Sequence, residues 1–123
     1  MNADINVLLL EDDVQLLQAL AEVLEDAGYR VQAVSDSHRA VDLSLDRDFD
    51  LVITDIRMAG MDGLDALARV REVHPEVRSL VVTGFSSEAD TIRAMRLGVG
   101  EYLNKPFRMD QFREAVDRLV DQI

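Results

Sequence analysis

Five short apolar segments alternate along the chain with five segments in which apolar residues recur at helical spacing. The expected strands are residues 5–10, 29–34, 50–55, 78–84 and 101–105. The expected helices are residues 14–27, 37–46, 63–73, 87–98 and 109–120. Strands that are apolar nearly throughout, each followed by a helix, are typical of a parallel sheet with helices on both faces. The alternation therefore predicts a doubly wound α/β fold with a five-stranded parallel sheet and five helices.

The length of 123 residues suits one domain, and we expect residues 1–123 to form it because no linker interrupts the pattern. Apolar residues make up 48% of the chain, which is enough to build a core. The absence of cysteine excludes disulfides and thiolate metal sites. No apolar segment is long enough to span a bilayer, and the first residues do not resemble a signal peptide. We therefore expect a cytoplasmic protein.

The formal charge of −11 arises from 24 acidic and 13 basic residues. A field of this sign repels nucleic acid and anionic membranes, so we expect no direct binding to either. It attracts cations and basic protein surfaces. The alternative is that the acidic balance serves only solubility.

Polar residues follow the expected strands at their carboxyl ends. They are Glu11, Asp12 and Asp13 after the first, Asp55 at the end of the third, Thr83 and Gly84 at the end of the fourth, and Lys105 at the end of the fifth. In an open parallel sheet these ends lie along one edge, where ligands bind. Carboxylates that gather there either raise one another's pKa or bind a cation, and an oxygen-only set suits magnesium. Taken singly, these residues also have ordinary roles, such as a helix cap for Asp12 or Asp13.

Four segments together resemble the receiver domain of two-component response regulators, and the resemblance covers the whole chain. They are LLLEDD at 8–13, DLVITDIRMAGMDG at 50–63, LVVTG at 80–84 and YLNKPF at 102–107. The resemblance implies the CheY-like fold of bacterial signalling proteins, with strand order 2-1-3-4-5. One departure is Ala59, where the family often has proline; we expect a slightly looser loop there.

The resemblance also implies a phosphoacceptor and a magnesium site. Asp55 would accept the phosphoryl group. The metal would be held by Asp12, by Asp55 and by the backbone carbonyl of Arg57, while Glu11 would reach it through water. Asp13 lies just outside this set, and we assign it to the start of the first helix.

Three further positions are implied to bind the phosphoryl group or to respond to it. Thr83 and Lys105 would bind its oxygens, with help from backbone N–H groups near Gly84. Tyr102 would act with Thr83 as the switch pair, turning inward when the threonine moves. We also expect a cis peptide bond between Lys105 and Pro106.

Two side chains are implied to flank the path of the water that hydrolyses the aspartyl phosphate. They are Arg57 and Phe85, and neither acts as a general base. We therefore expect slow autodephosphorylation. The alternative is that both side chains point into solvent and leave the path clear.

These implications predict a signalling switch rather than an enzyme with an external substrate. The donor would be a sensor histidine kinase or a phosphotransfer protein. The face of the fourth helix, fifth strand and fifth helix would then act on an output domain, a partner protein or a second copy. A phosphatase of the haloacid dehalogenase type is disfavoured, because such enzymes carry a general acid where this chain has Arg57. A third interpretation, an interaction domain that works without phosphorylation, remains open.

Overall fold

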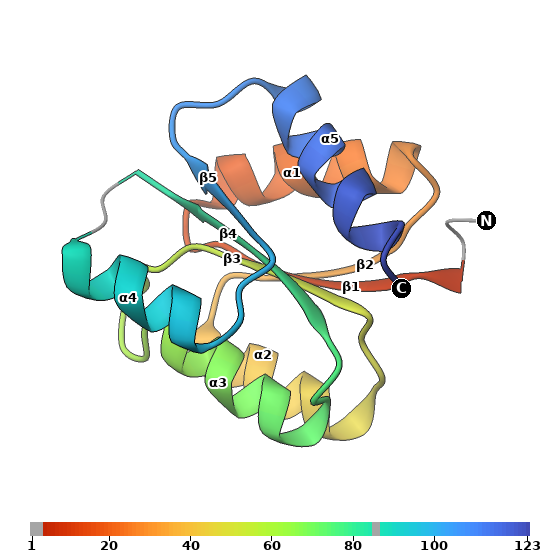
Figure 1. Cartoon of the computed structure of the whole chain (residues 1–123). Coiled ribbons are helices and arrows are strands. Elements are labelled where there is room, and N and C mark those ends of the chain that lie inside the picture. Colours follow the sequence, from red (N-terminus) through yellow and green to blue (C-terminus); the bar gives the residue numbers. More distant parts are fainter. Residues whose placement is uncertain (1–3, 85–86) are drawn as a thin grey trace.

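The computed structural model describes residues 4–84 and 87–123, and all ten expected elements lie within two residues of their expected bounds (Figure 1). The strands are β1 Asn6–Leu10, β2 Arg30–Val34, β3 Leu51–Thr54, β4 Arg78–Thr83 and β5 Glu101–Asn104. The helices are α1 Val14–Asp26, α2 Ser37–Asp46, α3 Gly63–Val73, α4 Glu88–Arg96 and α5 Met109–Val120. The five strands are parallel in the order β2-β1-β3-β4-β5, so the predicted topology is confirmed.

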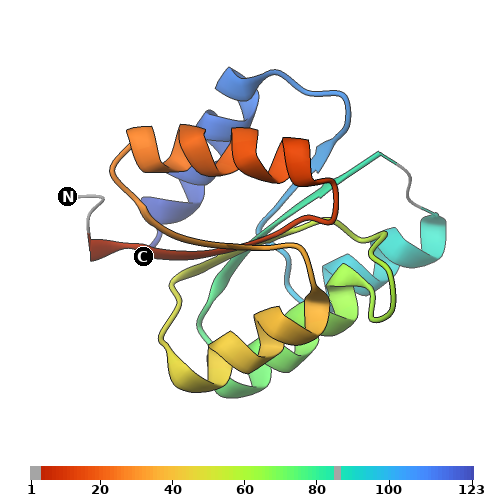
Figure 2. The same cartoon turned by 180° about the vertical axis from the view of Figure 1, so that it is seen from behind.

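The helices form two layers around the sheet. In Figures 1 and 2, α1 and α5 cover one face, whereas α2, α3 and α4 lie on the other. Strand β1 serves both layers, because Val7 and Leu9 join the core beneath α1 and α5, while Leu8 and Leu10 join the core beneath α2 and α3. This two-sided burial explains why the central strands are apolar nearly throughout.

Acidic or hydroxyl side chains cap the first four helices. Asp13 accepts hydrogen bonds from the backbone N–H groups of Gln15 and Leu16, so its assignment to the start of α1 is confirmed. Asp36 and Asp62 cap α2 and α3 in the same way. These caps satisfy N–H groups that a helix start leaves unpaired. Across residues 4–84 and 87–123, every helix is too short or too polar to cross a bilayer.

Helix α4 contributes fewer buried residues than any of the other four helices. Only Asp90 and Ala94 of this helix are buried. Ala94 packs in a small third cluster with Ile56, Leu64 and Val81. Figure 1 shows α4 at the margin of the molecule, beside the end of β4. The position of α4 therefore depends on few apolar contacts.

Candidate functional site

The register of the sheet brings the predicted residues to one edge. Leu10 of β1 lies opposite Thr54 of β3, so the residues after them, Glu11 and Asp55, are neighbours. Thr83 of β4 lies opposite Asn104 of β5, so Lys105 follows at the same edge. The predicted cluster is therefore formed by the ends of four strands.

Lys105, the only lysine of the chain, lies between the two buried acids. Its Nζ donates to Glu11 Oε1 at 2.7 Å and to Asp55 Oδ2 at 2.6 Å. Glu11 is 1% exposed and Asp55 is 6% exposed. Burial raises the pKa of Glu11 despite the lysine. Burial lowers the pKa of Lys105, but the hydrogen bonds to Asp55 and Glu11 outweigh it and raise that pKa above its ordinary value. The ammonium therefore stays charged and is shared by both carboxylates.

Hydrogen bonds hold both oxygens of the Asp55 carboxylate. While Oδ2 accepts from the lysine, Oδ1 accepts from the backbone N–H of Ile56 at 2.6 Å and from that of Arg57 at 3.3 Å. The loop that follows folds back, since the Gly63 N–H donates to the Ile56 carbonyl at 2.9 Å. A Cβ at Gly63 would overlap the carbonyl oxygen of Asp55. The glycine at this position is therefore required by the close approach of the α3 start to the strand end.

Oxygen donors for a cation also lie at this edge. Asp12 is exposed beside Glu11, whose Oε2 accepts from the backbone N–H of Asp13 at 3.2 Å. Within the described part of the chain, no group of three or more acidic or histidine side chains is arranged to enclose a metal ion. The donors fit Mg²⁺ nevertheless, because this ion keeps several waters and uses one or two carboxylates.

Thr83 and Gly84 lie beside the lysine. Thr83 is buried, and its carbonyl accepts from the backbone N–H of Lys105 at 2.9 Å. A Cβ at Gly84 would stand 3.5 Å from the Cβ of Lys105, so this glycine borders the lysine stem. The peptide bond between Lys105 and Pro106 is cis, as predicted. Phe85, which with Arg57 is predicted to flank the path of the hydrolytic water, lies outside the described residues.

Tyr102 of β5 points its hydroxyl into the protein. The ring packs against the cluster that holds Ile56, Val81 and Ala94. Among residues 4–84 and 87–123, the buried hydroxyl finds no hydrogen-bond partner. A buried hydroxyl without a partner is unfavourable by about 1–3 kcal/mol. The inward orientation of Tyr102 is therefore held at a cost by ring packing.

We expect Tyr102→Phe to raise the free energy of unfolding by about 1 kcal/mol, because it removes the unpartnered hydroxyl and keeps the ring. Urea denaturation measures this change. Tyr29→Phe is the matched control: the Tyr29 hydroxyl donates to Asp117 at 2.9 Å, so its loss should destabilise the protein. Equal destabilisation by both substitutions would contradict the buried, unpartnered state of the Tyr102 hydroxyl.

Sequence reasoning missed the partners of Arg57. The guanidinium of Arg57 forms an ion pair with Asp90 of α4. Nearby, Arg93 of α4 donates to Asp62 at 2.9 Å and to Asp65 at 2.7 Å. The spacing of Ser87 and Asp90 is typical of a capping box and indicates the helix start, but no sequence pattern indicates the pairing with Arg57.

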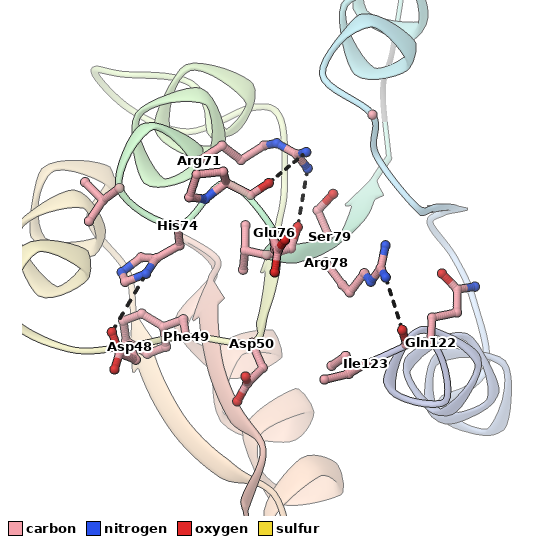
Figure 3. A pocket seen from close by; sticks show the side chains of 14 residues that line it. Asp48, Phe49, Asp50, Arg71, His74, Glu76, Arg78, Ser79, Gln122 and Ile123 are labelled. Carbon is pink, nitrogen blue, oxygen red and sulfur yellow. Dashed lines mark hydrogen bonds and ion pairs between the residues drawn. The ribbon is translucent and has the colours of Figure 1, made fainter.

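A hollow of about 950 Å³ lies at the opposite edge of the sheet (Figure 3). Its walls include Asp50 and Arg78, which stand at the amino ends of β3 and β4. None of the predicted site residues lines it. The basic side chains that line it already form hydrogen bonds or ion pairs within the protein. Arg78, for example, donates to the carbonyl of Gln122 at 3.1 Å. The size of this hollow therefore does not mark the functional site.

Comparison with known proteins identifies the family of this chain. A sequence profile of the response regulator receiver domain matches residues 7–117. The transcriptional regulatory protein ZraR of Salmonella typhimurium is 33% identical over 116 residues, which make up 94% of this chain and 26% of ZraR. This chain therefore spans about a quarter of the length of that relative.

Two solved structures are similar over nearly their whole length. The non-phosphorylated HemR receiver domain of Leptospira biflexa has 29% identity and a TM-score of 0.88, covering 95% of this chain and 94% of that one. The response regulator TrrA of Thermotoga maritima, solved in complex with Mg²⁺ and BeF, has 25% identity and a TM-score of 0.83, covering 94% of this chain and 98% of that one. With the profile match and the shared fold, the chain belongs to the response regulator receiver domain family.

Proposed function

We propose that this chain is a phosphorylation-dependent switch that accepts a phosphoryl group on Asp55 from a histidine kinase or a phosphotransfer protein. One observation carries the proposal. The Asp55 carboxylate lies at the sheet edge, with Oδ2 on the Lys105 ammonium at 2.6 Å and Glu11 on the same ammonium at 2.7 Å. A carboxylate held next to a cation that can bind a phosphoryl oxygen supports the role of phosphoacceptor for Asp55.

In the proposed transfer, an Asp55 carboxylate oxygen attacks the phosphorus of a phosphohistidine. The new O–P bond makes an aspartyl phosphate, and the electron pair of the breaking P–N bond returns to the imidazole nitrogen. Lys105 neutralises one phosphoryl oxygen, and the Thr83 hydroxyl and Gly84 N–H donate to others. A bound Mg²⁺ would neutralise the charge that develops during transfer. Asp12, Asp55 and the Arg57 carbonyl would hold it, with Glu11 acting through water.

The response would run through Thr83 and Tyr102 to the face formed by α4, β5 and α5. Among the described residues the buried Tyr102 hydroxyl has no hydrogen-bond partner, and this supports the role, because an orientation held at a cost is readily exchanged for another. On α4, Ile92 and Met95 are exposed and offer an apolar contact for a partner. Since ZraR is a transcriptional regulatory protein, we propose an output domain or partner protein as the target, with phosphorylation-dependent homodimerisation as one form of the response.

Magnesium and beryllofluoride, an analogue of the phosphoryl group, test the proposed site without a kinase. We expect magnesium alone to shift amide signals at residues 11–13 and 55–58, and beryllofluoride to extend the shifts to residues 83–84, 102 and 105. The Asp55→Asn variant should keep a weakened magnesium response and lose the beryllofluoride response. Shifts concentrated at the hollow of Figure 3 would contradict the assignment.

A further inference from the structure

Four side chains tie α4 to the loop that follows Asp55. We call Arg57, Asp62, Asp90 and Arg93 the α4 tether. Because only Asp90 and Ala94 of α4 are buried, these ionic contacts form a large part of its attachment. Figure 1 shows that α4 stands beside the loop between β3 and α3.

The first half of the tether joins Arg57 to Asp90. The guanidinium of Arg57 pairs with Asp90 Oδ2, which also accepts from the backbone N–H of Ser87 at 3.0 Å. The Asp90 side chain is 7% exposed, whereas that of Arg57 is 47% exposed. A carboxylate this buried needs its charge balanced, and the guanidinium that balances it is also half exposed to solvent.

The second half of the tether joins Arg93 to Asp62. Arg93 donates to both carboxylate oxygens of Asp62, at 2.9 and 3.3 Å. Its Nη1 also lies 3.9 Å from Asp90 Oδ1. If Arg57 moves away, Asp90 therefore still has the Ser87 N–H and a second arginine nearby. The loss of the first pair does not leave a buried charge alone.

The proposed phosphorylation site lies within reach of the first half. The backbone N–H of Arg57 is 3.3 Å from Asp55 Oδ1, so the arginine starts beside the phosphoacceptor. Phosphorylation would replace the single negative charge of the Asp55 carboxylate by a phosphoryl group that carries about 1.5 to 2 negative charges and three acceptor oxygens, which bind a guanidinium more strongly than a single carboxylate does.

We propose that Arg57 exchanges Asp90 for the phosphoryl group, and that Asp90 is a positioning residue which competes for Arg57 and thereby shortens the life of the phosphorylated state. The inference rests on the proposed function of Asp55. When Arg57 binds the phosphoryl oxygens it shields them from water, and the N-terminal end of α4 loses one of its attachments. Phosphoryl lifetime and the position of α4 are thus linked through one arginine.

Decay of the phosphoryl group tests this exchange. Wild type, Asp90→Asn, Arg57→Gln and the double variant are phosphorylated with acetyl phosphate, freed of donor and followed by intact mass in excess magnesium. We expect Asp90→Asn to lengthen the half-life about threefold or more, because Arg57 no longer has a competing carboxylate. Arg57→Gln should shorten the half-life, and the double variant should decay as Arg57→Gln does.

Two further variants separate this role from helix capping. Ser87→Ala removes the hydroxyl that accepts from the Asp90 N–H at 3.1 Å but leaves the Arg57–Asp90 pair in place. Asp90→Glu keeps the charge and the capping pattern. Both should decay close to the wild-type rate.

The outcomes also separate the exchange from the function on which it rests. A wild-type protein that takes up no phosphoryl group overturns both. Normal phosphorylation with an unchanged half-life in Asp90→Asn overturns the exchange alone. The exchange alone is also overturned if Asp90→Asn lengthens the half-life equally in the Arg57→Gln background. It is overturned as well if Ser87→Ala lengthens the half-life as Asp90→Asn does.

Discussion

Replacing Lys105 with methionine should slow phosphoryl transfer to Asp55 by about a hundredfold, because loss of one preorganised charged donor commonly has an effect of this size. Methionine keeps a flexible apolar stem and removes the ammonium that lies 2.6 Å from Asp55 Oδ2. The initial rate of mass gain with acetyl phosphate measures the change. Arg108→Met is the matched control, since it removes an exposed positive charge close by in the chain. A rate near that of wild type would contradict the role given to Lys105.

The same substitution should tighten magnesium binding. In the present structure the ammonium lies between Glu11 and Asp55 and offsets part of their negative charge. Without it, the two carboxylates would repel each other and attract a cation more strongly. A magnesium titration followed by amide shifts distinguishes this expectation from a general loss of the site, which would weaken binding instead.

Replacing Gly63 with alanine should lower the free energy of unfolding by about 3 kcal/mol, at the upper end for overpacking. The added Cβ would overlap the carbonyl oxygen of Asp55, so the start of α3 or the strand end must move. Urea denaturation measures the loss. Gly60→Ala is the matched control: Gly60 has φ +77° and open space around it, so only backbone strain of about 1 kcal/mol is expected. Equal losses would show that close packing at Gly63 is not decisive.

The fold and the site edge could be predicted because the responsible signals are local. The alternation of apolar strands and amphipathic helices defines the layers, and parallel strands place their carboxyl ends along one edge. Asp55 and Lys105, fifty residues apart, meet for this reason alone. The cap at Asp13 was also predictable, because an aspartate before a helical pattern is a local signal.

The remaining features depend on tertiary packing, which no local pattern encodes. The inward hydroxyl of Tyr102 reflects ring packing against several elements. The pairing of Arg57 with Asp90 joins a loop to a distant helix.

The phosphatase reading is now disfavoured on two grounds. The chain belongs to the receiver family, and Arg57 occupies the position two residues after Asp55 where such phosphatases carry a general acid. That side chain is engaged with Asp90 of α4. An arginine remains protonated at neutral pH and does not donate its proton to a leaving group.

The central claim is that Asp55 accepts the phosphoryl group, and intact mass after incubation with acetyl phosphate and magnesium tests it most directly. Wild type should gain the mass of one phosphoryl group, whereas Asp55→Asn should gain none, because the amide is not a competent nucleophile. Chelation of magnesium should suppress the gain in wild type. An equal gain in wild type and Asp55→Asn would contradict the assignment.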